Sequence, residues 1–215
     1  MTENLQVEYD ITKKSKFKKF YESNKVLIYS FISVIVILFI IFNLYLDYNE
    51  KKKISLSENY VEAKIYLENG DKEKAIKILK SIISANDSTY SSLSLFLLIN
   101  QNLIKESKEL SDLFTQLLNN NTFTDEIRNL MIYKKALLTS DFSNESGLLE
   151  SLKPLLSNKE TVWKAHALIL LGDYFTSKGE NIKAIEFYQE IFNIKNLHSD
   201  IYNHARNQLT IISNE

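Results

Sequence analysis

The side chains that most often carry out catalysis are scarce in this sequence and form no known motif. Its three histidines are His166, His198 and His204. Positions 198 and 204 do not share a helix face, and the sequence contains neither HExxH nor GxSxG. Asp200 and His204 are one helical turn apart, which predicts a surface pair between them rather than a metal or acid–base site. These residues predict that the protein is not an enzyme.

Patterns that would bind a cofactor or a nucleic acid are also missing. There is no cysteine, which excludes disulfides and thiolate metal ligands, and neither GxxxxGKS/T nor GxGxxG occurs. Residues 1–25 carry six lysines and four acidic residues, 6 − 4 = +2, so the remainder sums to −1 − 2 = −3 and offers no basic face for phosphates. We expect no cofactor, no metal, no nucleic acid and no small-molecule substrate.

The longest feature without a charge is the stretch from Val26 to Leu46, VLIYSFISVIVILFIIFNLYL. As a helix it would span about 31 Å, close to the hydrocarbon core of a bilayer. A soluble core helix rarely runs so long without a charge. A signal peptide has a shorter apolar region that ends at small residues, whereas Leu46 is followed by DYNEKKK. We therefore predict an uncleaved transmembrane helix over 26–46, in contact with membrane lipid.

Lysines flank the predicted anchor unequally. Six lie within residues 13–25, directly before it, and three follow it at Lys51, Lys52 and Lys53. The positive-inside rule then predicts a cytoplasmic N-terminus and a large domain on the other side of the membrane.

The rest of the chain predicts one helical domain. Four glycines and one proline in 215 residues leave few turn formers for a sheet, and the residues after the anchor suffice for a core. We expect a lysine-rich tail at 1–25, the anchor at 26–46, a linker or stalk at 47–55 and a helical repeat domain at 56–215.

Two hairpins with the same pattern lie far apart in this domain. In the first, Gly70 forms a turn and an apolar stripe runs from Ala75 to Ile83. In the last, Gly179 forms a turn and a stripe runs from Ala184 to Phe192. The two turns are offset by 179 − 70 = 109 residues, about three periods of roughly 36, which indicates a repeat protein.

Two weaker hairpins can be placed between them. Helices are expected over Tyr90–Asn100 and Ile104–Leu118, and then over Glu126–Leu138 and Ser146–Leu156. A last amphipathic helix, Asp200–Ile212, would cover the end of the stack. The sequence predicts an all-α fold: a transmembrane helix, an α-solenoid of about four hairpins and a C-terminal capping helix.

The fourth hairpin resembles the tetratricopeptide signature, W-x2-L-G-x2-Y followed by A-x3-F and P. The first hairpin has Ala63 and Ala75 at the two small positions, where helices approach closely, whereas the second has Leu95 and Ser107. The fourth hairpin fills the signature with Leu168, Leu171, Gly172, Phe175, Ala184 and Tyr188, and has Asn196 in place of proline.

The lysine-rich tail, the single anchor and about four loose repeats together resemble the ancillary Sec translocon subunit family, over nearly the whole chain. This resemblance implies a bacterial inner-membrane protein with a periplasmic tetratricopeptide-like domain. Its partners would be translocon subunits, secreted clients or periplasmic chaperones, and it would assist the hand-over of secreted proteins. Two other functions fit the same layout: a scaffold for cell division or outer-membrane assembly, or an accessory subunit of a membrane enzyme or transporter.

In stacks of such hairpins the first helix of each pair lines a concave groove. The register set by Ala75 and Ala184 predicts a groove with mixed apolar and polar positions, suited to weak contact with an extended peptide or a helix. In the alternative interpretation these positions are solvated surface, or the C-terminal helix covers them. The predicted positions are Tyr60, Lys64 and Leu67 in the first hairpin and His166, Ile169 and Asp173 in the fourth.

Overall fold

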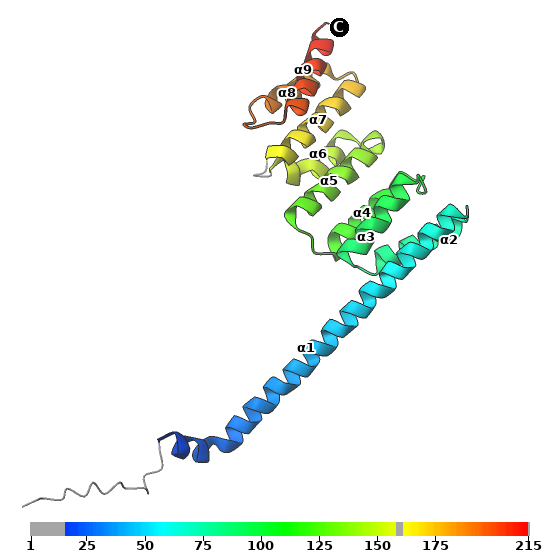
Figure 1. The fold of residues 1–215 in the computed structure, drawn as a ribbon. Coiled ribbons are helices and arrows are strands. Elements are labelled where there is room, and N and C mark those ends of the chain that lie inside the picture. The colour runs from blue at the N-terminus through cyan, green and yellow to red at the C-terminus, as the bar shows by residue number, and fades with distance from the viewer. Residues whose placement is uncertain (1–15, 158–160, 215) are drawn as a thin grey trace, which may run out of the picture. The chain divides into compact units, whose positions relative to one another are not determined.

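The computed structural model describes residues 16–157 and 161–214, which form nine α-helices, one short 3₁₀-helix and no strand (Figure 1). The predicted all-α fold is confirmed. Most of the predicted N-terminal tail, residues 1–15, lies outside the described residues. The chain divides into two compact units, Met1–Ile54 and Ser55–Glu215.

Helix α1 (Lys16–Glu68) supplies all the described residues of the first unit. From Val26 to Leu46 every side chain is exposed except Ile28, which is half-buried. The one polar amide in this stretch is satisfied within the helix, because Asn43 Nδ2 donates to the Phe39 carbonyl at 2.8 Å. An apolar helix with its side chains uncovered and its polar groups bonded internally is a candidate membrane anchor.

The second unit contains four helical hairpins and a final helix. The C-terminal part of α1, from Ser55, pairs with α2 in the first hairpin. A short 3₁₀-helix, η1 (Ser140–Phe142), follows α5. The remaining helices are α2 (Lys72–Ser84), α3 (Ser88–Asn100), α4 (Ser107–Asn120), α5 (Asp125–Thr139), α6 (Glu145–Leu156), α7 (Thr161–Ser177), α8 (Asn181–Ile191) and α9 (Ser199–Ser213).

Local sequence explains where these helices begin. Asp71 caps α2, as its Oδ1 accepts a hydrogen bond from the Lys74 amide at 3.2 Å. Gly70 and Gly179 have φ values of 82° and 71°, in the left-handed region that side chains with a Cβ disfavour. The two glycines therefore make the tight turns that separate the helices of the first and fourth hairpins.

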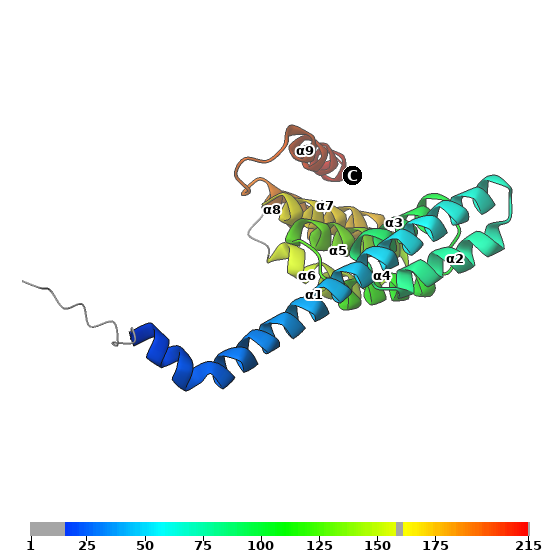
Figure 2. The same ribbon diagram turned by 60° about the horizontal axis from the view of Figure 1, so that its bottom comes forward.

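The hairpins follow one another in chain order from α2 to α9 (Figure 1). The first helices α3, α5 and α7 form one layer and the second helices α4 and α6 form another (Figure 2). Two clusters of buried side chains hold the layers together. The first extends from Leu56 to Met131 and the second from Ala136 to Ile212. The layer of first helices is the one in which a groove was expected.

Candidate protein-binding groove

A pocket of about 430 Å³ opens between α3 and α5, in the layer of first helices. Apolar side chains dominate its lining, and two of them are well exposed: Leu93 at 42% and Ile127 at 39%. Met131 is buried and belongs to the first core cluster, so the pocket is anchored to the core. The apolar lining residues are Leu93, Phe96, Phe123, Ile127, Leu130 and Met131. We call this feature the α3–α5 pocket.

Hydroxyl groups complete the lining of the α3–α5 pocket, and none of the described lining residues is charged. Thr124 stands at the N-cap of α5, but its side chain makes no capping hydrogen bond. A hydroxyl can donate and accept, so these groups suit peptide N–H and C=O groups alike. The hydroxyl residues of the lining are Ser88, Thr89, Ser92, Thr122 and Thr124.

The helix register explains why α3 presents this face. Asp87 caps α3, with Oδ1 accepting from the Thr89 and Tyr90 amides at 3.1 and 2.8 Å. Ser92 lies three residues before Leu95 and Phe96 one residue after it. Tyr60 and Lys64 have the same offsets from Ala63. Two of the three positions predicted in the first hairpin, Tyr60 and Lys64, therefore have equivalents in the second hairpin that line a pocket, whereas Ile99, the equivalent of Leu67, does not.

The groove positions predicted in the first hairpin lie on α1 and do not line the α3–α5 pocket. Tyr60 is half-buried, and its ring centroid is 6.4 Å from that of Tyr90 on α3. Lys64 is exposed and Leu67 is half-buried. Of these three side chains, only that of Lys64 is exposed to solvent.

Two of the positions predicted in the fourth hairpin are partly covered. His166 lies against the rings of Tyr133 and Trp163, with centroid distances of 5.4 and 6.1 Å. Burial lowers the pKa of His166 below its ordinary value of 6.5, because desolvation disfavours the charged imidazolium. Ile169 packs against the second core cluster. The Trp163 Nε1–H donates to Glu126 Oε2 at 3.2 Å, so this stack joins α5 to α7.

Asp173, the third predicted position, is engaged by two neighbouring helices. Its Oδ1 accepts a hydrogen bond from the Tyr188 hydroxyl of α8 at 2.6 Å and lies 3.0 Å from His204 Nε2 of α9. Burial and the bond to Asp173 together raise the pKa of the Tyr188 hydroxyl. The predicted pair between Asp200 and His204 is wrong: His204 faces α7, and Asp200 lies 3.3 Å from His198 Nδ1.

The chain matches the family model of the tetratricopeptide repeat-like domain over residues 18–209. It belongs to that family. No curated protein matches the chain closely enough to count as a relative. Domains of the tetratricopeptide repeat-like family typically act as protein-interaction scaffolds rather than catalysts. Within residues 16–157 and 161–214, no three histidine, aspartate or glutamate side chains gather into a metal site.

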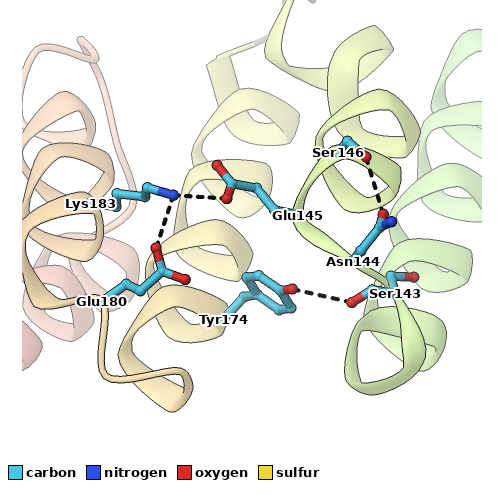
Figure 3. A network of polar contacts seen from close by, with 7 residues as sticks. All are labelled: Ser143, Asn144, Glu145, Ser146, Tyr174, Glu180 and Lys183. Atoms are coloured by element: carbon cyan, nitrogen blue, oxygen red, sulfur yellow. Dashed lines mark hydrogen bonds and ion pairs between the residues drawn. The ribbon is translucent and has the colours of Figure 1, made fainter.

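A polar network stiffens the tetratricopeptide repeat-like domain between its third and fourth hairpins (Figure 3). Lys183 Nζ on α8 lies 2.7 Å from Glu145 Oε2 on α6 and 2.9 Å from Glu180 Oε2. The hydrogen bonds to these two carboxylates raise the pKa of Lys183. The Tyr174 hydroxyl on α7 donates to the Ser143 carbonyl at 3.1 Å. These contacts join the third and fourth hairpins through residues that do not line the α3–α5 pocket.

Three of the eleven described residues that line the α3–α5 pocket could have been found from the repeat register: Ser92, Phe96 and Leu130. Leu130 lies six residues before Ala136, as His166 lies six residues before Gly172, so Leu130 follows once the buried Ala136 is taken as the small position of the third hairpin. The second hairpin has Leu95 and Ser107 at the positions where the signature has small residues, so the sequence does not show where its two helices cross. The Ser92 and Phe96 positions follow only once that crossing is fixed.

Proposed function

We propose that this protein is a single-anchor adaptor of the bacterial inner membrane. Residues 26–46 cross the membrane, the tail 1–25 is cytoplasmic, and residues 47–55 link the anchor to a periplasmic domain, 56–215. There the groove binds proteins at or near the Sec translocon and assists the hand-over of secreted proteins. The partners are translocon subunits, secreted clients or periplasmic chaperones.

One observation carries this proposal: a chain with an uncovered apolar helix also holds an open apolar pocket. Anchoring alone would need no pocket, and a soluble adaptor would need no stretch like Val26 to Leu46. A pocket lined by exposed Leu93 and Ile127 marks a surface that is covered in a complex. Tethering this pocket to a membrane raises its effective concentration toward chains that emerge from that membrane.

The orientation rests on the lysines that flank the anchor. A reporter that is active only in the periplasm should be active when it is fused after Glu215. The same reporter fused after Asn24, in a truncation without the anchor, should be inactive. A silent C-terminal fusion in a normally expressed protein would reverse the orientation.

Photocrosslinking in intact cells tests the binding role. Crosslinkers at Leu93 and Ile127 should capture translocon subunits, secreted clients or periplasmic chaperones, and Lys64 tests whether the groove continues along α1. Lys77, exposed on α2, is the control. Equal capture from Lys77 and from the pocket positions would remove the groove from the proposal. Capture of division proteins or of one dedicated membrane enzyme would replace the Sec translocon as the partner.

A further inference from the structure

We infer that the α3–α5 pocket selects uncharged, extended peptide segments that carry large apolar side chains. The inference rests on the proposed function, because it names the kind of segment that the adaptor binds. It excludes charged motifs as the primary ligand.

The charge distribution around the pocket supports this selectivity. None of the described lining residues is charged. Two acidic groups next to the lining in sequence have partners: Asp87 caps α3, and Glu126 accepts from Trp163. Asp125 and Arg128 also adjoin the lining in sequence, but neither lines the pocket. Because no charged residue lines the pocket, a charged ligand side chain inserted into it would lose hydration without meeting a counter-charge in the lining, which disfavours binding.

The size and surface of the pocket fit side chains rather than a folded domain. A volume of about 430 Å³ is at the lower end of the range for ligand pockets. Leu93 and Ile127 stand exposed on opposite helices, and Phe96 and Leu130 are half-buried between them. Covering these surfaces with a Leu, Ile or Phe side chain removes apolar area from water on both partners.

The hydroxyl groups of the lining can form hydrogen bonds with the backbone of the ligand. An extended peptide carries alternating N–H and C=O groups that must keep their hydrogen bonds when water leaves. Thr124 makes no capping bond, and Ser92 uses its hydroxyl hydrogen on the Ser88 carbonyl at 2.6 Å, which leaves its oxygen able to accept. Such contacts read the backbone and not the sequence, as a binder of many clients requires.

Fluorescence anisotropy with the full-length chain in lipid nanodiscs tests the inference. The probe is a short peptide with blocked ends, in which Leu and Phe alternate with Ser and Thr. Two matched peptides carry Glu or Lys in place of each Phe. The apolar peptide should bind about tenfold to a hundredfold more tightly than both charged peptides. Equal binding of all three, or no binding of the apolar peptide, would overturn the inference.

A matched pair of variants locates the binding. Ile127→Glu and Ile182→Glu each place a carboxylate in the first turn of a helix, where the helix dipole favours it, so both should fold. Ile182 is 79% exposed on α8 and lies outside the pocket lining. Ile127→Glu should weaken the apolar peptide about tenfold or more and strengthen the Lys peptide, whereas Ile182→Glu should change neither. Identical effects of the two variants would contradict a site in this pocket.

The outcomes separate this inference from the proposed function. Selective peptide binding without translocon crosslinks in cells would keep the inference and remove the proposed location. Translocon crosslinks from Ile127 without peptide selectivity would keep the location and remove the inference. Competition by a soluble short-chain fatty acid, with no selectivity among peptides, would identify a lipid chain as the occupant and overturn the inference.

Discussion

Phe96 of α3 and Asp173 of α7 occupy equivalent positions in their hairpins, one residue after the point at which the two helices cross, but their surroundings differ. Phe96 lines an open pocket. Asp173 is bonded to Tyr188 on α8 and to His204 on α9, which packs against α7 and α8. The repeat register therefore decides which way a side chain faces. The next helix in the stack decides whether that side chain is bonded to other protein groups: Asp173 stays 42% exposed, but His204 of α9 contacts its carboxylate.

The same two regions also differ at the helix crossing. In the first hairpin the positions that Gly172 and Tyr188 occupy in the fourth hold Ala63 and Leu79, both fully buried. Gly172 and Tyr188 are also buried. A Cβ on Gly172 would lie 2.7 Å from Tyr188 Cδ1 and closer still to neighbouring ring atoms. The fourth hairpin thus lacks the methyl group that Ala63 provides, and the larger Tyr188 ring fills that space. The Tyr188 hydroxyl then donates to Asp173.

The largest predicted effect follows from this exchange. Gly172→Ala should displace the Tyr188 ring and destabilise the domain by about 1–3 kcal/mol, since overpacking outweighs the gain in helix propensity. Chemical denaturation of the full-length chain measures the change.

The double variant Gly172→Ala with Tyr188→Leu recreates the combination of the first hairpin. It should recover part of the stability that Gly172→Ala loses, in a clearly non-additive way. Strict additivity would show that the ring and the added methyl group do not compete for one space. Ala63→Gly, the reverse change in the first hairpin, should cost only about 0.5–1 kcal/mol.

The helices of this fold could be predicted from the sequence because their signals are local. The expected helix 126–138 lies within α5, and 200–212 lies within α9. Apolar periodicity is enough to place these two helices, and Gly70, Gly179 and Asp71 mark the turns of the first and fourth hairpins. The availability of the groove is not local. It depends on how α9 docks, which brings together Asp173 and His204, side chains 31 residues apart.

The pairing of His204 shows why local rules fail at this point. Asp200 is one turn away on the same helix and makes the simplest partner. Docking of α9 buries Ile201, Ala205 and Ile212, and this burial turns His204 toward α7. Tertiary packing outweighs an exposed helical pair, which contributes only about 0.2–0.5 kcal/mol.

The second prediction tests whether the contact between His204 and Asp173 holds α9 against α7. His204→Ala should remove a hydrogen bond to a carboxylate and loosen α9 at a cost of about 1 kcal/mol. Hydrogen exchange should quicken in α9 more than in α3, because α9 opens as a local unit. Thr210→Ala, on the exposed side of α9, is the control. An unchanged exchange pattern in His204→Ala would mean that apolar contacts alone hold α9.

A smaller effect is predicted from pH. The pKa of His166 is lowered in the folded protein, so the unfolded chain takes up its proton first as pH falls. The contribution is fully present above the ordinary pKa of 6.5 and is lost as pH falls from there toward the lower folded pKa. His166→Gln should flatten this part of the stability profile compared with the unaltered chain. A steeper acid loss in His166→Gln would contradict a neutral, buried imidazole.

The smallest effects concern two lysines that join neighbouring second helices. Lys80 on α2 pairs with Glu109 on α4, and Lys183 on α8 pairs with Glu145 on α6. All four side chains are partly exposed, so the pairs are a matched comparison. Exposed pairs contribute about 0.2–1 kcal/mol, and salt screens them. Lys80→Ala should therefore cost little, and less still at high salt.

Lys183 has additional contacts that should make it the more important of the two. Its Nζ also lies 2.9 Å from Glu180 Oε2 and 5.0 Å from the centroid of the Phe175 ring. The ring interaction and the packed stem respond weakly to salt, unlike a simple ion pair. Lys183→Ala should thus lower the denaturation midpoint more than Lys80→Ala does, and the difference should persist at high salt. If salt abolishes the difference, the two lysines are equivalent surface pairs, and the stiffness of the C-terminal half comes from Tyr174 and the buried core instead.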